Sequence, residues 1–177
     1  MDREWLEAWR VSVTAALAEL LGSFSQRFGF EPDVHAVGPP ASGEAVASLA
    51  ALRPAPARDL LVFYENIGEV SLPDVGNGYF IHSPRLVIDS VRNGGLRRIG
   101  PPFGADILPF ASDGGGGLYA LPAAEAGPVY RLRDFALIDG VADTQVVETA
   151  ASDLQEFLHR LRAAVEVFAS TGSLTDL

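Results

Sequence analysis

The sequence predicts an α+β protein in which helices pack against a small, mostly antiparallel sheet. Helical periodicity dominates both ends, because apolar residues recur at three- and four-residue spacings over 3–28 and again after Ser152. Between the ends, 106–134 holds three short strand-like runs separated by turn residues, as in a meander. Grouped helices and strands indicate the α+β class, and 177 residues suit one domain over 1–177.

The N-terminal segment 3–28 is predicted to form a long amphipathic helix. Its apolar stripe begins with Trp5 and Trp9 and continues through leucines and phenylalanines at helical spacing. The tryptophans have two interpretations: they belong to the core, or they anchor a partner at an exposed end of the helix. We expect them in the core.

Two shorter helices are predicted next, after a loop or short strand over 31–42. Ser42 caps the first, which runs to about Leu52. The second lies in "PARDLLVFYENIG", where proline is tolerated in the first turn and Gly68 is expected to end the helix as a C-terminal glycine.

Strands are predicted from this point on. The first two cover 69–72 and 78–82, with a turn at "PDVGNG", and Ser83 then caps a helix that runs to about Arg92. The arginine-rich segment "NGGLRRIGPP" is predicted to be a mobile, solvated connector. The meander follows as "DILPFAS", "GLYALP" and "GPVYRLRD", and 135–149 adds one or two strands.

The last helix has a strong start signal. Ser152 and Gln155 have the spacing of a capping box, and Gly172 is expected to close the helix. The tail 173–177 is expected to be frayed.

Four consecutive glycines in "PFASDGGGGLYAL" raise the question of a ligand-binding loop. A P-loop needs a lysine after its glycines, and this chain contains no lysine. A dinucleotide fingerprint needs a helix after the glycines, whereas "LYALP" alternates like a strand. We therefore predict a hairpin turn in which Gly114, Gly115 and Gly116 are structural and Asp113 organises the backbone.

Composition and charge narrow the function. The chain is 48% hydrophobic and 20% charged, with no cysteine and no apolar run long enough to span a bilayer. Its acidic N-terminus is unlike a signal peptide, so a cytoplasmic location is expected, with no membrane partner. The net charge of −10 argues against nucleic-acid binding. The acids attract a basic protein partner, or they only maintain solubility.

No catalytic motif is present, and we expect neither an enzyme nor a cofactor. The histidines at 35, 82 and 159 have no metal-ligand spacing, and no Gly-x-Ser-x-Gly elbow occurs. His82 is the one histidine kept as a candidate, at a strand end. A carboxylate-dependent hydrolase built from Glu65, Asp74 or Asp113 stays open as the weakest alternative, since these acids flank glycine turns.

Three stretches together resemble the SUKH superfamily, which is named for fungal Smi/Knr cell-wall regulators and their bacterial relatives. They are "LLVFYENIGEVSLPDVGNGYFIHSP", then "ILPFASDGGGGLYAL", then "GPVYRL", and the resemblance covers roughly 37–135. Two departures stand out: the family often has an acid where this chain has Gly117 and Leu118, and its first turn reads Asn-Gly rather than Asn-Ile-Gly. The matching residues are Phe63, Tyr64, Asn66, Gly68, Ile81, Ser83, Ile88, Pro109, Phe110, Ala111, Asp113, Gly114, Gly116, Tyr119, Val129 and Tyr130.

The resemblance implies helices packed on a curved sheet, no catalysis, and binding to another protein. Bacterial members resemble immunity proteins that neutralise toxin domains, frequently nucleases, so the expected partner is a basic toxin domain. An intracellular adaptor of the Smi/Knr type, without a toxin, is the alternative. The expected binding surface surrounds the glycine hairpin and the "FYENIG" turn, with Tyr64 and Tyr119 equally placed to be core. Its candidate residues are Tyr64, Glu65, Asn66, Tyr79, Asp113 and Tyr119.

Overall fold

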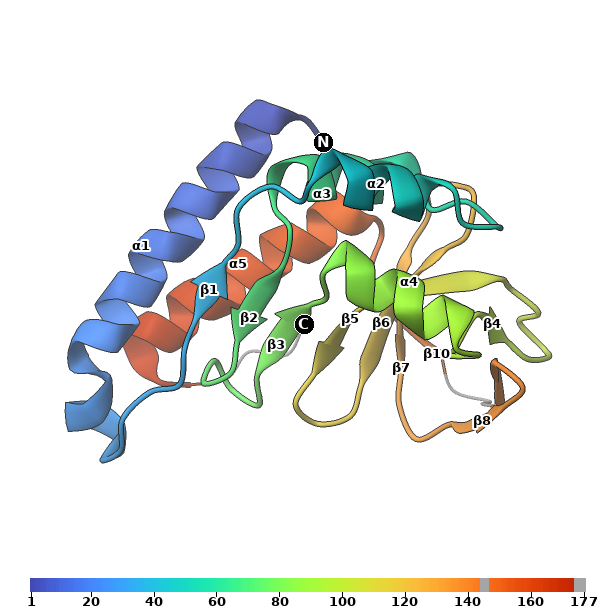
Figure 1. Ribbon diagram of the computed structural model, residues 1–177. Helices are drawn as coiled ribbons and strands as arrows, with labels where there is room; N and C mark the ends of the chain where they lie inside the picture. Colours follow the sequence, from blue (N-terminus) through green and yellow to red (C-terminus); the bar gives the residue numbers. More distant parts are fainter. Residues whose placement is uncertain (144–146, 174–177) are drawn as a thin grey trace.

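The computed structural model describes residues 1–143 and 147–173 (Figure 1). Within them a seven-stranded antiparallel sheet has the order β1-β2-β3-β5-β6-β7-β10, and a small sheet has the order β4-β9-β8. This arrangement confirms the predicted α+β fold with long terminal helices. The helices are α1 (Arg3–Phe28), α2 (Gly43–Ala50), α3 (Arg58–Asn66), α4 (Pro84–Arg92) and α5 (Leu154–Thr171).

The large sheet contains the predicted meander at its centre. Its strands are β1 (Ala36–Val37), β2 (Val70–Leu72), β3 (Tyr79–Ile81), β5 (Ile107–Asp113), β6 (Leu118–Pro122), β7 (Val129–Leu132) and β10 (Val147–Ala151). The small sheet consists of β4 (Arg98–Ile99), β8 (Ala136–Ile138) and β9 (Val141–Asp143). The segment 135–149 therefore supplies three strands where one or two were predicted.

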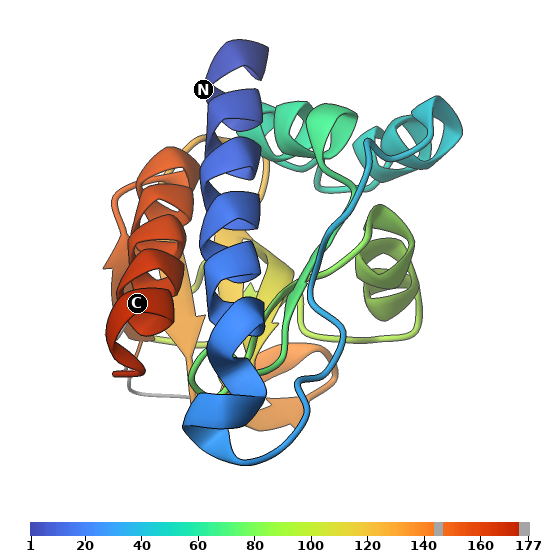
Figure 2. The same cartoon turned by 90° about the vertical axis from the view of Figure 1, so that its left-hand side faces the viewer.

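The two terminal helices lie side by side against one face of the large sheet (Figure 2). Phe157 of α5 meets the rings of Phe110 and Tyr119, with centroids 5.4 and 5.0 Å apart. Trp9 of α1 is buried and its indole N–H donates to the carbonyl oxygen of Leu158 at 2.6 Å. Trp9 thus lies in the core, as expected, and Trp5 packs partly buried against it.

The small sheet covers part of the opposite face. Ile107, Ala120 and Leu132 of the large sheet pack there against Ile99 and Ala142 of the small one. β4 pairs with β9 in parallel, so the segment predicted to be a mobile connector holds a strand. Parallel pairing joins segments far apart in the chain, and local residue types carry no signal for it.

Gly68 has a different role from the predicted C-terminal cap. Helix α3 ends at Asn66, Ile67 is extended, and Gly68 is not in the left-handed region. Its N–H donates to the carbonyl oxygen of Pro39 at 2.7 Å, and a Cβ at Gly68 would lie 2.7 Å from that same oxygen. The glycine is needed for this close approach of two backbones.

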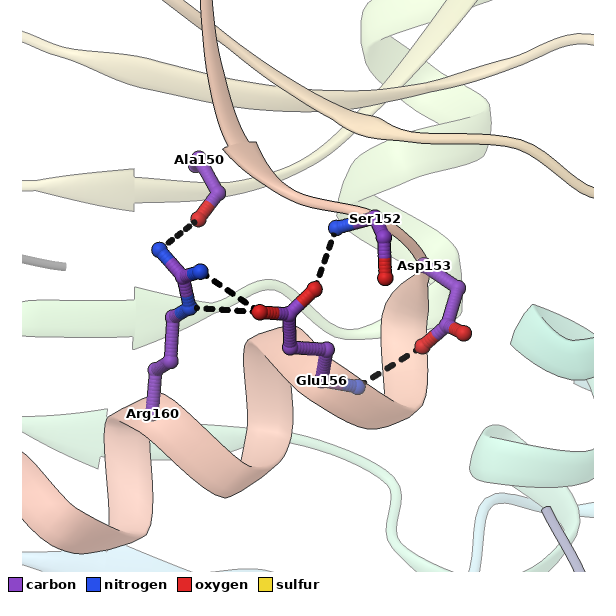
Figure 3. Close-up of polar contacts among 5 residues, drawn as sticks. All are labelled: Ala150, Ser152, Asp153, Glu156 and Arg160. Atoms are coloured by element: carbon purple, nitrogen blue, oxygen red, sulfur yellow. Dashed lines mark hydrogen bonds and ion pairs between the residues drawn. The ribbon is translucent and has the colours of Figure 1, made fainter.

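The cap of α5 lies one residue later than predicted (Figure 3). The Asp153 carboxylate accepts from the Glu156 N–H at 2.7 Å, while the Glu156 carboxylate accepts from the Ser152 N–H at 2.6 Å. A carboxylate is favoured at a helix N-terminus by the helix dipole, so Asp153 and Glu156 prevail over Ser152 and Gln155. Gly172 closes the helix in the left-handed conformation, as predicted. The tail predicted to fray is 173–177, and residues 174–177 of it lie outside the described residues.

None of the helices in the described ranges has both the length and the apolar character required to cross a membrane.

Candidate functional site

Two turns meet at one end of the strands of the large sheet, at the lower side of Figure 1. One joins β2 to β3 and ends at Gly78, and the other is the glycine run between β5 and β6. The Gly114 N–H donates to the Gly78 carbonyl oxygen at 3.1 Å. A Cβ at Gly114 would lie 1.7 Å from the Asn77 carbonyl oxygen, so only glycine fits between the two turns. The predicted hairpin turn is confirmed.

Asp113 organises the glycine turn, as predicted. Its Oδ1 accepts from the N–H groups of Gly115 and Gly117 at 2.9 and 2.8 Å, and its side chain is only 5% exposed. A Cβ at Gly117 would lie 2.5 Å from the Asp113 carboxylate, so the turn requires a glycine at this position. Gly116 supplies the positive φ of 86° that closes the turn.

The glycine turn has no backbone N–H left for a ligand. Gly114 donates to Gly78, Gly115 and Gly117 donate to the Asp113 carboxylate, and Gly116 donates to the Asp113 carbonyl oxygen at 3.3 Å. A phosphate cradle needs such groups pointing outward and unpaired. The run is therefore a structural turn, and recognition at this edge falls to side chains.

Arg131 is the partner of Asp113, and the sequence prediction missed it. It lies on β7 opposite Tyr119 of β6, and its guanidinium donates to the Asp113 Oδ2. The same guanidinium lies 5.3 Å from the centre of the Tyr119 ring. One signal was present: in "GPVYRL" strand alternation puts Arg131 on the same side as buried Val129, and a charged residue facing inward needs a partner.

The Asp113–Arg131 pair is charged. Burial raises the pKa of Asp113, but hydrogen bonds from Arg131, Gly117 and Gly115, with the charge of Arg131, outweigh burial and hold that pKa below its ordinary value. Burial lowers the pKa of Arg131, but the hydrogen bond to Asp113 and the electrostatic effects of Tyr119, Asp113 and Tyr79 outweigh burial and raise that pKa above its ordinary value. A carboxyl that stays ionised is suited to holding a structure together and not to donating a proton as a general acid.

A polar hollow of about 430 Å³ opens beside this pair. We call it the hairpin hollow. Gly115 and Gly116 form part of its wall, and the side chains that line it are those of Asn77, Tyr79, Asp113, Arg131, Arg133 and Asp134. Turns and strand ends from three parts of the chain thus converge on one concave surface, the usual shape of a binding site.

The six predicted binding residues divide into two groups. Tyr79 and Asp113 are direct neighbours across β3 and β5, and both line the hairpin hollow. Tyr119 lies beneath this region, fully buried with the core, which was its alternative interpretation.

The other three lie at the opposite end of the strands, around the end of α3 near the top of Figure 1. Tyr64 is fully buried and its hydroxyl donates to the His82 carbonyl oxygen at 2.7 Å, so it too belongs to the core. Glu65 is exposed and Asn66 is half-buried. The "FYENIG" turn and the glycine hairpin therefore do not form one surface.

The histidines have ordinary structural surroundings. His82 Nε2 lies 2.8 Å from the Ser112 hydroxyl, and burial lowers the pKa of His82. Neither residue lines the hairpin hollow. The His35 side chain is buried, and its Nε2 lies 3.0 Å from an Asp74 oxygen. No group of three or more potential metal ligands occurs in the part of the chain that the structure describes.

A scan against protein-family models finds no match for the chain, and a search of curated proteins finds no significant match.

Proposed function

We propose that the protein is a non-catalytic, SUKH-like protein-binding domain that acts as an immunity protein, binding and neutralising a toxin domain such as a nuclease in the cytoplasm. The glycine hairpin is the observation that carries the proposal. Asp113, Gly114 and Gly116 carry much of the resemblance to SUKH proteins, and these residues build the turn beside the hairpin hollow. A rigid turn that places polar side chains around a hollow suits recognition of another protein.

The hydrogen bonds within the site favour a binding role over a catalytic one. Asp113 is held ionised by three donors, the N–H groups of Gly115 and Gly117 and the guanidinium of Arg131, so both oxygens of the one buried acid of the hollow already have hydrogen-bond partners. A general acid needs a raised pKa and an approach for substrate. The side chains at the mouth, those of Asn77, Arg133 and Asp134, are exposed and therefore accessible to a partner.

The net negative charge of the protein, rather than a local acidic patch, supports a basic partner. The chain carries 23 acids against 13 arginines, and exposed acids occur on separate elements, for example Glu7 on α1, Glu44 on α2 and Glu166 on α5. This spread does not define a single acidic patch. A net negative charge still attracts a basic toxin domain at long range and speeds their encounter.

The test is co-expression with each large secreted protein encoded by a neighbouring gene, scored by cell survival and by co-purification. We expect wild-type protein to restore survival and to form a stable complex. Asn77→Trp, whose bulk would block the exposed mouth of the hollow, is expected to lose protection, whereas Asn93→Trp, the same change at the exposed end of α4, is expected to keep it. Survival without any complex, or no rescue from any neighbouring toxin, would refute the immunity role.

A further inference from the structure

We propose that the hairpin hollow is a carboxylate-binding site. Building on the proposed function, the carboxylate is one presented by the partner protein, either an aspartate or glutamate side chain or the end of its chain. The proposal follows from an imbalance in the hollow between hydrogen-bond donors and acceptors.

Donors are in excess on the β7 side. A guanidinium has five N–H donors in a planar fork that matches a carboxylate. Within the described ranges, Arg131 makes one hydrogen bond, through Nη2 to Asp113, and its buried Nε has no partner. Arg133 follows directly after the end of β7. It lines the same hollow, and its side chain bonds to none of the other described residues.

Acceptors in the hollow are mostly consumed. Asp113 uses Oδ1 for two glycine N–H groups and Oδ2 for Arg131. The carboxylate of Asp134 and the side-chain oxygen of Asn77 remain, but both residues are exposed at the mouth, where water competes for these acceptors. The two arginines and two aspartates cancel in charge, so a ligand is selected by the unused N–H groups rather than by net charge. A carboxylate supplies four lone-pair sites to such donors and can accept a bidentate guanidinium.

Arg131, the buried binding group, is held in place before any ligand arrives. Arg131 is 9% exposed, is fixed on one side by Asp113, and lies against the Tyr119 ring. Asp113 is itself fixed by the glycine turn. When the donors are already ordered, binding a ligand costs less conformational entropy, and the affinity is higher. This preorganisation distinguishes the hollow from the exposed arginines elsewhere, such as Arg85, whose side chain is 90% exposed.

The test uses the full chain labelled with ¹⁵N, with acetate as the probe at constant ionic strength set by chloride. We expect saturable shifts of the Arg131 Nε–H and of the Gly115–Gly117 amides, with a millimolar dissociation constant. Arg133→Gln is expected to weaken acetate about tenfold or more, the effect of losing one charge-assisted hydrogen bond. Arg85→Gln is the matched control and is expected to change nothing.

Three results would overturn the proposal: no saturable response to acetate, an equal response to chloride alone, or unchanged acetate binding in Arg133→Gln. A saturable response to methylguanidinium but not to acetate would also overturn it and would assign a basic ligand group. These outcomes require no partner, so they are separate from failure of the immunity role.

Once a complex with a toxin is available, two sets of changes in the toxin identify the source of the carboxylate. Amidating the toxin C-terminus is expected to weaken the complex if the chain end binds, and Asp→Asn or Glu→Gln changes on the toxin surface are expected to do so if a side chain binds. Arg133→Gln should lower affinity for the toxin in either case. An unchanged affinity would contradict the assignment of the hollow to the partner.

Discussion

Replacing Asp113 by asparagine tests whether the buried ion pair holds the hairpin edge together. Asparagine has nearly the same shape, and its amide oxygen can still accept from the Gly115 and Gly117 N–H groups. The change removes the charge that pairs with Arg131, whose guanidinium is then buried without a partner. Breaking a buried pair from one side costs about 3–5 kcal/mol. Because the pair lines a hollow that admits water, we expect the lower end, about 3 kcal/mol.

This loss is large against the ~5–15 kcal/mol by which a domain is normally stable. Urea unfolding followed by tryptophan fluorescence would measure it. With an m-value near 2–3 kcal/mol/M, the midpoint should fall by roughly 1–1.5 M. Asp134→Asn is the control, since this exposed acid lines the same hollow, and its effect should lie within about 0.5 kcal/mol.

A double-mutant cycle separates pairing from packing. Asp113→Leu should destabilise strongly, and adding Arg131→Met should recover part of the loss, because the second change removes the unpaired buried charge. The reasoning would be refuted by a loss under about 1 kcal/mol in Asp113→Asn, or by a double variant whose cost equals the sum of the two single changes.

The same pair has a defined pH dependence. The folded pKa of Asp113 lies below its ordinary value, so its contribution is fully present above the unfolded carboxyl pKa of about 3.9. It is lost as the pH falls through the folded pKa. The stability difference between wild type and Asp113→Asn should therefore be constant near neutral pH and shrink in acid.

Further expectations concern the backbone, the core and the α5 cap. Gly114→Ala forces a Cβ into a neighbouring carbonyl oxygen and should cost more than about 2 kcal/mol in urea unfolding, whereas Gly22→Ala, in open space on α1, should stabilise by about 0.5–1 kcal/mol. Trp9→Phe removes the hydrogen bond to Leu158 and should cost about 1–3 kcal/mol. Hydrogen bonds from neighbouring residues lower the pKa of Glu156 to about 2, so carboxyl NMR should find it ionised at pH 3.

The features that sequence predicted correctly depend on neighbours in the chain. The stripe of α1, the glycine hairpin and the ordering role of Asp113 follow from periodicity and turn chemistry within a few residues. The α5 cap shows the limit of such signals: two capping boxes overlap by one residue, and the stronger acceptors of Asp153 and Glu156 decided between them.

The features that the sequence analysis did not predict depend on the register of strand pairing and on contacts between segments far apart in the chain. Asp113 and Arg131 are 18 residues apart and meet only because β5, β6 and β7 pair with particular offsets. Gly68 was assigned to a helix end because its contact with Pro39 crosses between distant segments. No single-sequence pattern fixes such offsets, since a shift of one residue turns every side chain to the other face.

The expected binding surface combined two turns, the "FYENIG" turn and the glycine hairpin, that the structure places at opposite ends of the strands. Tyr64 and Asn66 precede the strands, and the glycine hairpin lies at the other end of them. The two motifs are related through the core: Tyr64 bonds to His82 just beyond β3, while Tyr79 at the start of β3 faces Asp113. The first motif fixes one end of a short strand and the second fixes the other, so both are needed for the fold, while the polar hairpin hollow lies at the second end.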